Sequence, residues 1–170
     1  MSVKKTVYVA FFIAVGIVLQ IMESFIPVMI IIPGFKIGFA NMAGLLALLI
    51  WDEKTMSVVT LSRIFLAALL QGTLFSVSFW LSLTGGILSL LAMIVAYKSK
   101  KFSIFGISIL GACFHNVGQV IAITFIYQQY FMQLFLPILM ALSNVSGLCI
   151  AYLTQKVYIR LKGRLQYGTL

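Results

Sequence analysis

The stretch GACFHNVGQ, from Gly111 to Gln119, places three strongly polar side chains in the middle of a long apolar run. His115 is the only histidine of the chain, Asn116 follows it directly, and Gln119 lies four residues after it. Residues four apart share a helix face, whereas Asn116 is turned by about 100° from His115. Imidazole and amide groups in such a run can bind a polar ligand, or they can hold two helices together. The sequence leaves both interpretations open.

Arg63 is a charged residue inside another apolar run. A guanidinium without a partner in the middle of a membrane costs several kcal/mol, so this residue needs an anion. Glu23 is the better partner by depth, because Asp52 and Glu53 lie in a polar turn roughly 15 Å away along the helix. A bound anionic substrate would serve equally well. We expect one of these two arrangements.

A third polar group occurs in PGFKIGFAN, from Pro33 to Asn41. Lys36 lies here between Gly34 and Gly38, and glycine permits unusual backbone angles and close approach. Irregular backbone inside a membrane is tolerated where it lines a cavity or is covered by protein. Lys36 and Asn41 are therefore candidates for a binding site, although a solvated loop explains the lysine equally well.

Composition places these residues in a membrane protein. Hydrophobic residues make up 62% of the 170 residues, charged residues make up 9%, and the mean hydropathy is +1.14. Soluble domains are about 45–50% apolar and about 25% charged, so this chain cannot cover a water-soluble surface. The net charge of +9 comes mainly from basic residues between the apolar runs and at the chain ends. That pattern is typical of membrane topology, and we expect no nucleic-acid partner.

Six apolar runs predict an all-α bundle of six membrane-spanning helices in a single domain over residues 1–170. The spans are expected at about residues 6–22, 39–51, 55–70, 73–97, 104–127 and 131–158. The second and third are short, so five crossings are the alternative if these two form a re-entrant pair. The sequence TGG at Thr84–Gly86 predicts a kink, a binding notch or a packing crossover. Cys113 and Cys149 are expected to be buried and without a disulfide.

Basic residues determine the expected orientation. With the N-terminus in the cytoplasm, ten basic residues lie inside and only Lys36 lies outside, while Arg63 is within a span. We therefore expect a multi-pass protein of the cytoplasmic membrane with both termini inside. The cytoplasmic set comprises Lys4, Lys5, Lys54, Lys98, Lys100, Lys101, Lys156, Arg160, Lys162 and Arg164.

The elements PGFKIGFAN, LSLTGG and GACFHNVGQ, in this order and spacing, resemble the Gx transporter family, which is also labelled heptaprenyl diphosphate synthase component I. The resemblance covers nearly the whole chain. That family is similar to the S components of energy-coupling factor (ECF) transporters, which are six-helix membrane proteins that capture vitamins or metals. The resemblance implies an S-component-like bundle that docks on a membrane coupling subunit driven by two ATPases.

The resemblance also implies a docking surface on the first helix. S components carry an Ala-x-x-x-Ala pattern there, and Ala10 and Ala14 have this spacing. Small residues four apart make a flat face on which another helix can pack closely. Ala10 and Ala14 are therefore the expected contacts with the coupling subunit.

Catalysis is not expected from this chain. Prenyl synthases hold Mg²⁺-diphosphate with Asp-rich motifs because hard cations take several oxygen ligands, and Asp52 is the only aspartate here. The sequence has no Walker motif, so an ATPase would be a separate chain. A single histidine, without cysteine or carboxylate at ligand spacing, predicts no metal site. We expect no cofactor either.

These observations favour a membrane-embedded, S-component-like subunit for uptake of a small molecule that has a polar or anionic head and an apolar body. Such a ligand would be vitamin-like, or related to isoprenoids or quinones. The alternative is a non-catalytic membrane accessory of prenyl diphosphate or quinone synthesis, or of a quinone-linked redox system. The expected ligand-binding residues are Lys36, Asn41, Arg63, His115, Asn116 and Gln119.

Overall fold

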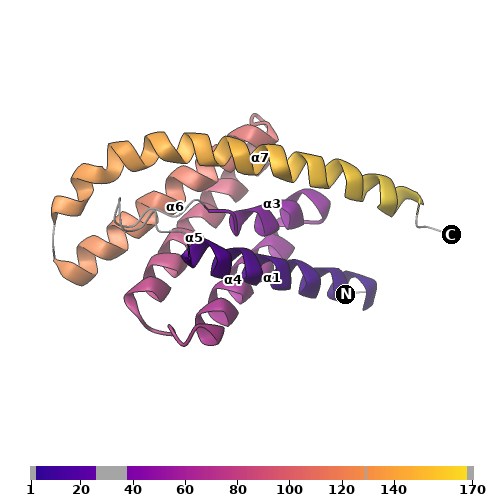
Figure 1. Cartoon of the computed structure of the whole chain (residues 1–170). Coiled ribbons are helices and arrows are strands. Elements are labelled where there is room, and N and C mark those ends of the chain that lie inside the picture. The colour runs from indigo at the N-terminus through magenta and orange to yellow at the C-terminus, as the bar shows by residue number, and fades with distance from the viewer. Residues whose placement is uncertain (1–2, 26–37, 129, 168–170) are drawn as a thin grey trace.

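A computed structural model describes residues 3–25, 38–128 and 130–167, except for the side chains of residues 132 and 163–167. Within these ranges the chain forms α-helices and one short 3-10 helix, and no strand (Figure 1). The predicted all-α class is therefore confirmed. The elements are α1 (Val3–Ser24), α3 (Asn41–Ile50), α4 (Glu53–Leu70), α5 (Val77–Ser99), α6 (Ile104–Tyr127), η1 (Tyr130–Phe135) and α7 (Leu136–Tyr167).

Capping side chains explain where three helices begin. Asp52 precedes α4 and accepts hydrogen bonds from the backbone N–H and the hydroxyl of Thr55, both at 2.6 Å. Ser76 and Ser103 precede α5 and α6 and accept from a backbone N–H three residues later. These bonds satisfy amide groups that the start of a helix leaves without an intrahelical partner.

The connection before α5 is longer than the sequence predicts. Gly72 and Phe75 have φ angles of 64° and 63°, and the left-handed region interrupts a right-handed helix. As a result α5 starts at Val77, four residues after the predicted start of the fourth span.

The helices alternate in direction along the bundle. α5 packs against α6 and α6 against α7, while α1 packs against α4 and α3. Figure 1 shows α3 between α7 and α1, with the start of α1 and the end of α7 at the same end of the bundle. Two ion pairs join neighbouring elements at that end, Lys5 to Asp52 at 3.1 Å and Lys98 to Glu53 at 3.0 Å.

In the described part of the chain, four segments are long and apolar enough to cross a membrane: α1, α5, α6, and Gln133–Lys162, which includes most of α7. The chain is therefore a multi-pass membrane protein. By contrast, α3 has ten residues and is about 15 Å long, half of a hydrocarbon core of roughly 30 Å. Seven of its residues are buried, so α3 packs inside the protein instead of facing lipid. The count of six crossings stays a prediction.

Glycines bring α5 and α6 into close contact. A Cβ atom on Gly118 would lie 2.7 Å from the carbonyl oxygen of Thr84 and 2.8 Å from Cα of Gly85. A Cβ atom on Gly85 would lie 2.8 Å from the carbonyl oxygen of His115. Because α5 is continuous from Val77 to Ser99, the TGG sequence fits a packing crossover. The crossover places His115 directly against α5.

The two cysteines differ in their surroundings. Both are free thiols, and Cys113 is buried, but Cys149 is exposed on α7. The expectation of burial is therefore wrong for Cys149. Membrane helices are apolar on the packed face and on the lipid face alike, so an apolar run does not tell the two faces apart.

Candidate functional site

Arg63 lies at the centre of a cluster of buried polar side chains. It lies on α4 with 3% of its surface exposed, and its guanidinium donates hydrogen bonds to Oδ1 of Asn41 at 2.7 Å and to Oε1 of Gln20 at 3.1 Å. Gly16 on α1 makes room for it, since a Cβ there would lie 2.9 Å from Cδ of Arg63. Three helices, α1, α3 and α4, therefore hold the guanidinium.

The carboxylate of Glu23 lies in the same region. Glu23 is buried near the end of α1 and accepts a hydrogen bond from the backbone N–H of Gly38. Its negative charge acts electrostatically on Arg63. The hydrogen bonds of Arg63 itself go to neutral amide oxygens, and its Nε is buried without a hydrogen-bond partner among the described residues. Glu23 thus acts on the guanidinium at longer range, without a direct hydrogen bond to it.

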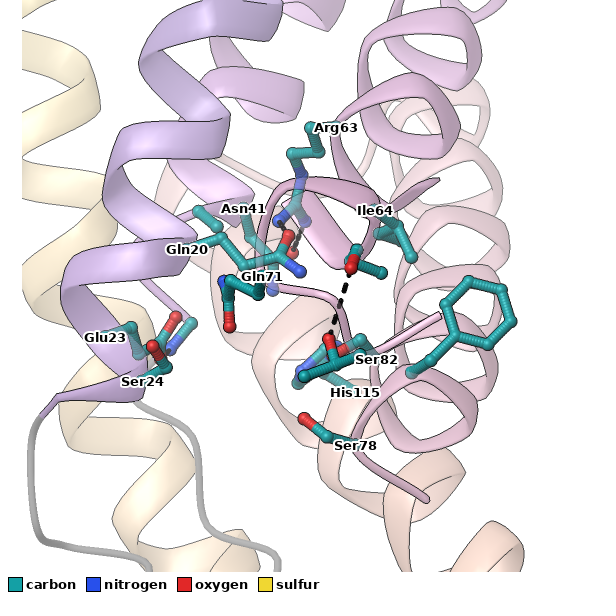
Figure 2. A pocket seen from close by; sticks show the side chains of 15 residues that line it. Gln20, Glu23, Ser24, Asn41, Arg63, Ile64, Gln71, Ser78, Ser82 and His115 are labelled. Atoms are coloured by element: carbon teal, nitrogen blue, oxygen red, sulfur yellow. Dashed lines mark hydrogen bonds between the residues drawn. The ribbon is translucent and has the colours of Figure 1, made fainter. Parts of the chain in front are cut away.

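A small cavity of about 50 Å³ opens beside these side chains, between α1, α3, α4, α5 and α6 (Figure 2). Such a volume can hold a few water molecules or the polar head of a ligand. Ten of its fifteen lining residues are polar, although the bundle around it is apolar. The polar lining residues are Gln20, Glu23, Ser24, Asn41, Arg63, Gln71, Thr73, Ser78, Ser82 and His115.

His115 and Gln119 form a pair on one face of α6. The amide nitrogen of Gln119 lies 3.0 Å from Nε2 of His115, and because an amide nitrogen can only donate, the ring nitrogen accepts. Gln119 is fully buried, and its Oε1 has no hydrogen-bond partner within the described ranges. His115 lines the cavity, and the hydrogen bond from Gln119 orients the ring of His115.

Asn116 points the other way, toward α7. Its amide nitrogen donates to Oγ of Ser143 at 2.5 Å and to the carbonyl oxygen of Leu139 at 3.3 Å. Farther along the same interface, the hydroxyl of Ser108 donates to the carbonyl oxygen of Gly147 at 2.8 Å. Asn116 therefore belongs to the polar contacts that join α6 to α7.

The residues that form the cavity lie within a stretch that matches a known family. The family model of heptaprenyl diphosphate synthase component I matches residues 12–157. The chain belongs to this family. No curated protein and no solved structure matches the chain. The resemblance drawn from the motifs PGFKIGFAN, LSLTGG and GACFHNVGQ is thus confirmed for the family.

The name heptaprenyl diphosphate synthase component I implies a subunit that works with another chain. A component of a synthase need not carry the catalytic groups, so the family name does not itself assign catalysis to this subunit.

The structure brings together part of the expected site in this member of the component I family. Asn41, Arg63 and His115 line one cavity, Gln119 contacts His115, and Asn116 bonds to α7. Lys36 lies outside the described residues. On α1, both Ala10 and Ala14 are exposed.

Sequence reasoning missed several polar residues of the cavity. Gln20 is the clearest of them, because it accepts from Arg63 and lies three residues before Glu23, on the same face of α1. That spacing could have pointed to it. Ser78 and Ser82 are four residues apart on α5, but serine is common in membrane helices and its spacing carries little signal.

Proposed function

We propose that the chain is a membrane-embedded binding subunit for uptake of a small molecule, and that it works in the manner of an ECF S component. The observation that carries this proposal is the polar cavity around Arg63, Asn41 and His115 in an otherwise apolar bundle. Polar and ionisable groups inside a membrane are costly and usually mark the path or the binding site of a polar ligand.

The charge of Arg63 favours a ligand with an anionic or strongly polar head. The guanidinium is almost fully buried, its hydrogen bonds go to neutral oxygens, and Glu23 acts on it through space. An anionic group in the cavity would add a second counter-charge and accept hydrogen bonds. The imidazole of His115 and the hydroxyl of Ser82, both at the cavity, offer further polar contacts.

The size of the cavity limits how a ligand can sit. Binding sites for small molecules usually measure about 300–1,000 Å³, whereas this cavity is about 50 Å³. The cavity can therefore take the polar head, while an apolar body needs the surrounding helices to separate or must lie toward the bilayer. An isoprenoid-like, quinone-like or vitamin-like molecule has this division into head and body.

Uptake requires a partner, and α1 offers a surface for it. Ala10 and Ala14 are exposed and four residues apart, so a helix of a coupling subunit could approach the α1 backbone closely there. In this proposal the chain resides in the cytoplasmic membrane, the cavity faces outward, and ATP is hydrolysed by separate subunits.

Native mass spectrometry of the purified chain tests the binding function. We expect the wild-type protein to carry a non-covalent small molecule of defined mass. Arg63→Met should lose most of it, because the variant keeps the side-chain length and removes the charge. His115→Ala should weaken binding by about 1–3 kcal/mol, the usual cost of leaving a buried polar group unpaired.

Leu69→Met is the matched control, since Leu69 lies on the same helix as Arg63 but is 61% exposed. It should keep the bound molecule. Thermal unfolding of each variant separates loss of ligand from loss of fold. Wild-type protein that carries only membrane phospholipids, or folded Arg63→Met that keeps the same molecule, would show that the cavity is not a ligand site.

The family name favours a second function. As a component of heptaprenyl diphosphate synthase, the chain would be a non-catalytic membrane accessory of prenyl diphosphate synthesis. A subunit of this kind would equally serve quinone synthesis or a quinone-linked redox system. Affinity purification of the tagged chain from its own cells separates the two functions. Recovery of a coupling subunit with ATPases supports uptake, whereas recovery of a soluble prenyl synthase or redox proteins supports the accessory role.

A further inference from the structure

A second and larger cavity lies at the opposite end of the bundle from the polar cavity. It has a volume of about 500 Å³ and lies where α5 ends and α6 begins. Its buried side is apolar, formed by Leu49 of α3 and by Ile104 and Ile107 of α6. Its exposed side carries Lys98 and Lys100. The cavity therefore joins an apolar floor to a cationic rim.

The rim is positively charged and held in place. Lys98 pairs with Glu53 of α4 at 3.0 Å and so links the end of α5 to the start of α4. Lys100 and Lys101 follow, and the first turn of α6 adds the partial positive charge of a helix N-terminus. Among the described residues Lys98 pairs with Glu53, whereas Lys100 and Lys101 make no ion pair, so their charges are available to an added anion.

Lys100 also has an unusual backbone. It caps α5 with φ 56°, in the left-handed region where glycine is the usual residue. A lysine here places its charge at the cavity despite a less favourable backbone. The position is useful experimentally, because glycine removes the charge and relieves the backbone at the same time.

From these features we propose that the cavity binds one anionic phospholipid of the adjacent leaflet. Its phosphate lies at Lys98 and Lys100, and the first part of an acyl chain lies along Leu49 and Ile107. The volume is in the range of small-molecule sites, and basic pockets between helices near the membrane surface are suited to phosphate head groups. The lysines supply the charge complement, and the apolar floor favours a lipid over a free phosphate. This inference is independent of the function proposed for the polar cavity.

Titration of the purified full-length chain with defined lipids, followed by native mass spectrometry, tests the proposal. The probes are dioleoyl phosphatidylglycerol, which is anionic, and dioleoyl phosphatidylcholine, which is zwitterionic and has the same acyl chains. We expect phosphatidylglycerol to bind about tenfold more tightly. Equal affinity for the two lipids would overturn the proposal.

Lys100→Gly should weaken phosphatidylglycerol binding about fivefold and leave phosphatidylcholine binding and thermal stability no lower than in the wild type. Lys100→Gln is a second variant that keeps a side chain of similar length. Lys4→Gln is the matched control, because Lys4 is exposed at the same end of the bundle but lies on α1, away from the cavity. An equal effect of the Lys4 and Lys100 variants would mean that only overall charge matters, and the site would be rejected.

Two further experiments show whether the occupant of the cavity is a lipid or a free phosphate. Leu49→Trp fills the apolar floor and should lower lipid binding with all lysines present. Millimolar sn-glycerol 3-phosphate, a soluble head group, should not displace phosphatidylglycerol from the wild-type protein. If it does so, and Leu49→Trp binds the lipid normally, the cavity recognises a phosphate alone and the lipid proposal is wrong.

Discussion

At the residue scale, the three polar side chains of α6 have different tasks. His115 reaches the polar cavity, Gln119 contacts the ring of His115, and Asn116 bonds to α7. An unpaired amide or imidazole in an apolar interior is costly, so each needs its own partner. Asn116 finds its partners on α7, whereas His115 and Gln119 share another face of α6 and bond to each other.

Asn116→Ala should therefore lower stability more than ligand binding. The substitution removes the donor to Ser143 and to the carbonyl oxygen of Leu139, with an expected loss of about 1–3 kcal/mol in the free energy of unfolding. Thermal and denaturant unfolding in detergent measure this loss. The control is Val145→Ala at a position of α7 that is 62% exposed, for which we expect less than about 0.5 kcal/mol. Unchanged stability of Asn116→Ala would contradict this structural role.

At the element scale, the contact between α5 and α6 depends on glycine. A Cβ atom on Gly118 would meet backbone atoms of Thr84 and Gly85 at 2.7–2.9 Å, and backbone cannot rotate away as a flexible side chain can. Gly118→Ala should cost about 1–3 kcal/mol of stability, as overpacking of a core does. Circular dichroism melting in detergent measures it. Ala141→Val adds methyl groups at an exposed position of α7 and should change the melting temperature little.

Gly118→Ala should also disturb the ring of His115, which faces Gly85 across the same crossover. Reduced retention of the ligand together with reduced stability would agree with this arrangement. A fully stable Gly118→Ala protein would contradict the close crossing of α5 and α6.

The second prediction at this scale concerns Asp52, which caps the start of α4. Hydrogen bonds from Thr55, and then the contact with Lys5, lower the pKa of Asp52 from 3.8 to about 2. A carboxylate whose pKa is lower in the folded state adds stability above its unfolded pKa, and that stability is lost as the pH falls through about 2. Asp52 is 45% exposed, so solvent screening limits the contribution to about 1 kcal/mol or less.

Asp52→Asn removes this charge and keeps a capping side chain. Compared with the wild type, it should be less stable above about pH 4, and the difference should vanish toward pH 2. Asp52→Ala also loses the cap and should be less stable than the wild type throughout that range. Unfolding followed as a function of pH checks both variants, and a pH-independent difference for Asp52→Asn would exclude the charge as its cause.

At the scale of the whole molecule, the distribution of basic residues predicts that both termini lie in the cytoplasm. Single cysteines introduced into a Cys149→Ser background, followed by an impermeant maleimide on intact cells, test this orientation. Phe75→Cys, in the exposed connection before α5, should be labelled. Lys101→Cys, at the other end of α5, should be labelled only after the cells are opened. Labelling of Lys101→Cys in intact cells would reverse the orientation.

Docking on a coupling subunit is the second prediction at this scale. Ala10→Trp and Ala14→Trp should abolish co-purification of that subunit, because a bulky ring on a close-packed face prevents contact. Both alanines are exposed, so the substitutions should leave the chain folded. Val95→Trp, at a site 69% exposed on α5, is the control. Equal recovery of the partner with all three variants would remove the support for an S-component-like role.

The sequence by itself determines the helical class and most helix positions. Apolar runs, the serine and aspartate caps and the polar turns are local features, and a membrane span needs a length that can be counted along the chain. The motifs also determine the family. The sequence does not determine which apolar residues are buried in the protein, because lipid and protein interior favour the same apolar side chains. Cys149 is an example, since it lies in an apolar run but is exposed.

Only the tertiary structure decides which polar groups meet. Arg63 bonds to Gln20, 43 residues away, and to Asn41, 22 residues away, and neither spacing is visible in a local pattern. The same holds for Asn116, whose adjacency to His115 suggests a shared site although its bonds lie 23 and 27 residues away on α7. Neighbours in sequence diverge on a helix by about 100° per residue, so helix packing assigns each side chain to a cavity or to another helix.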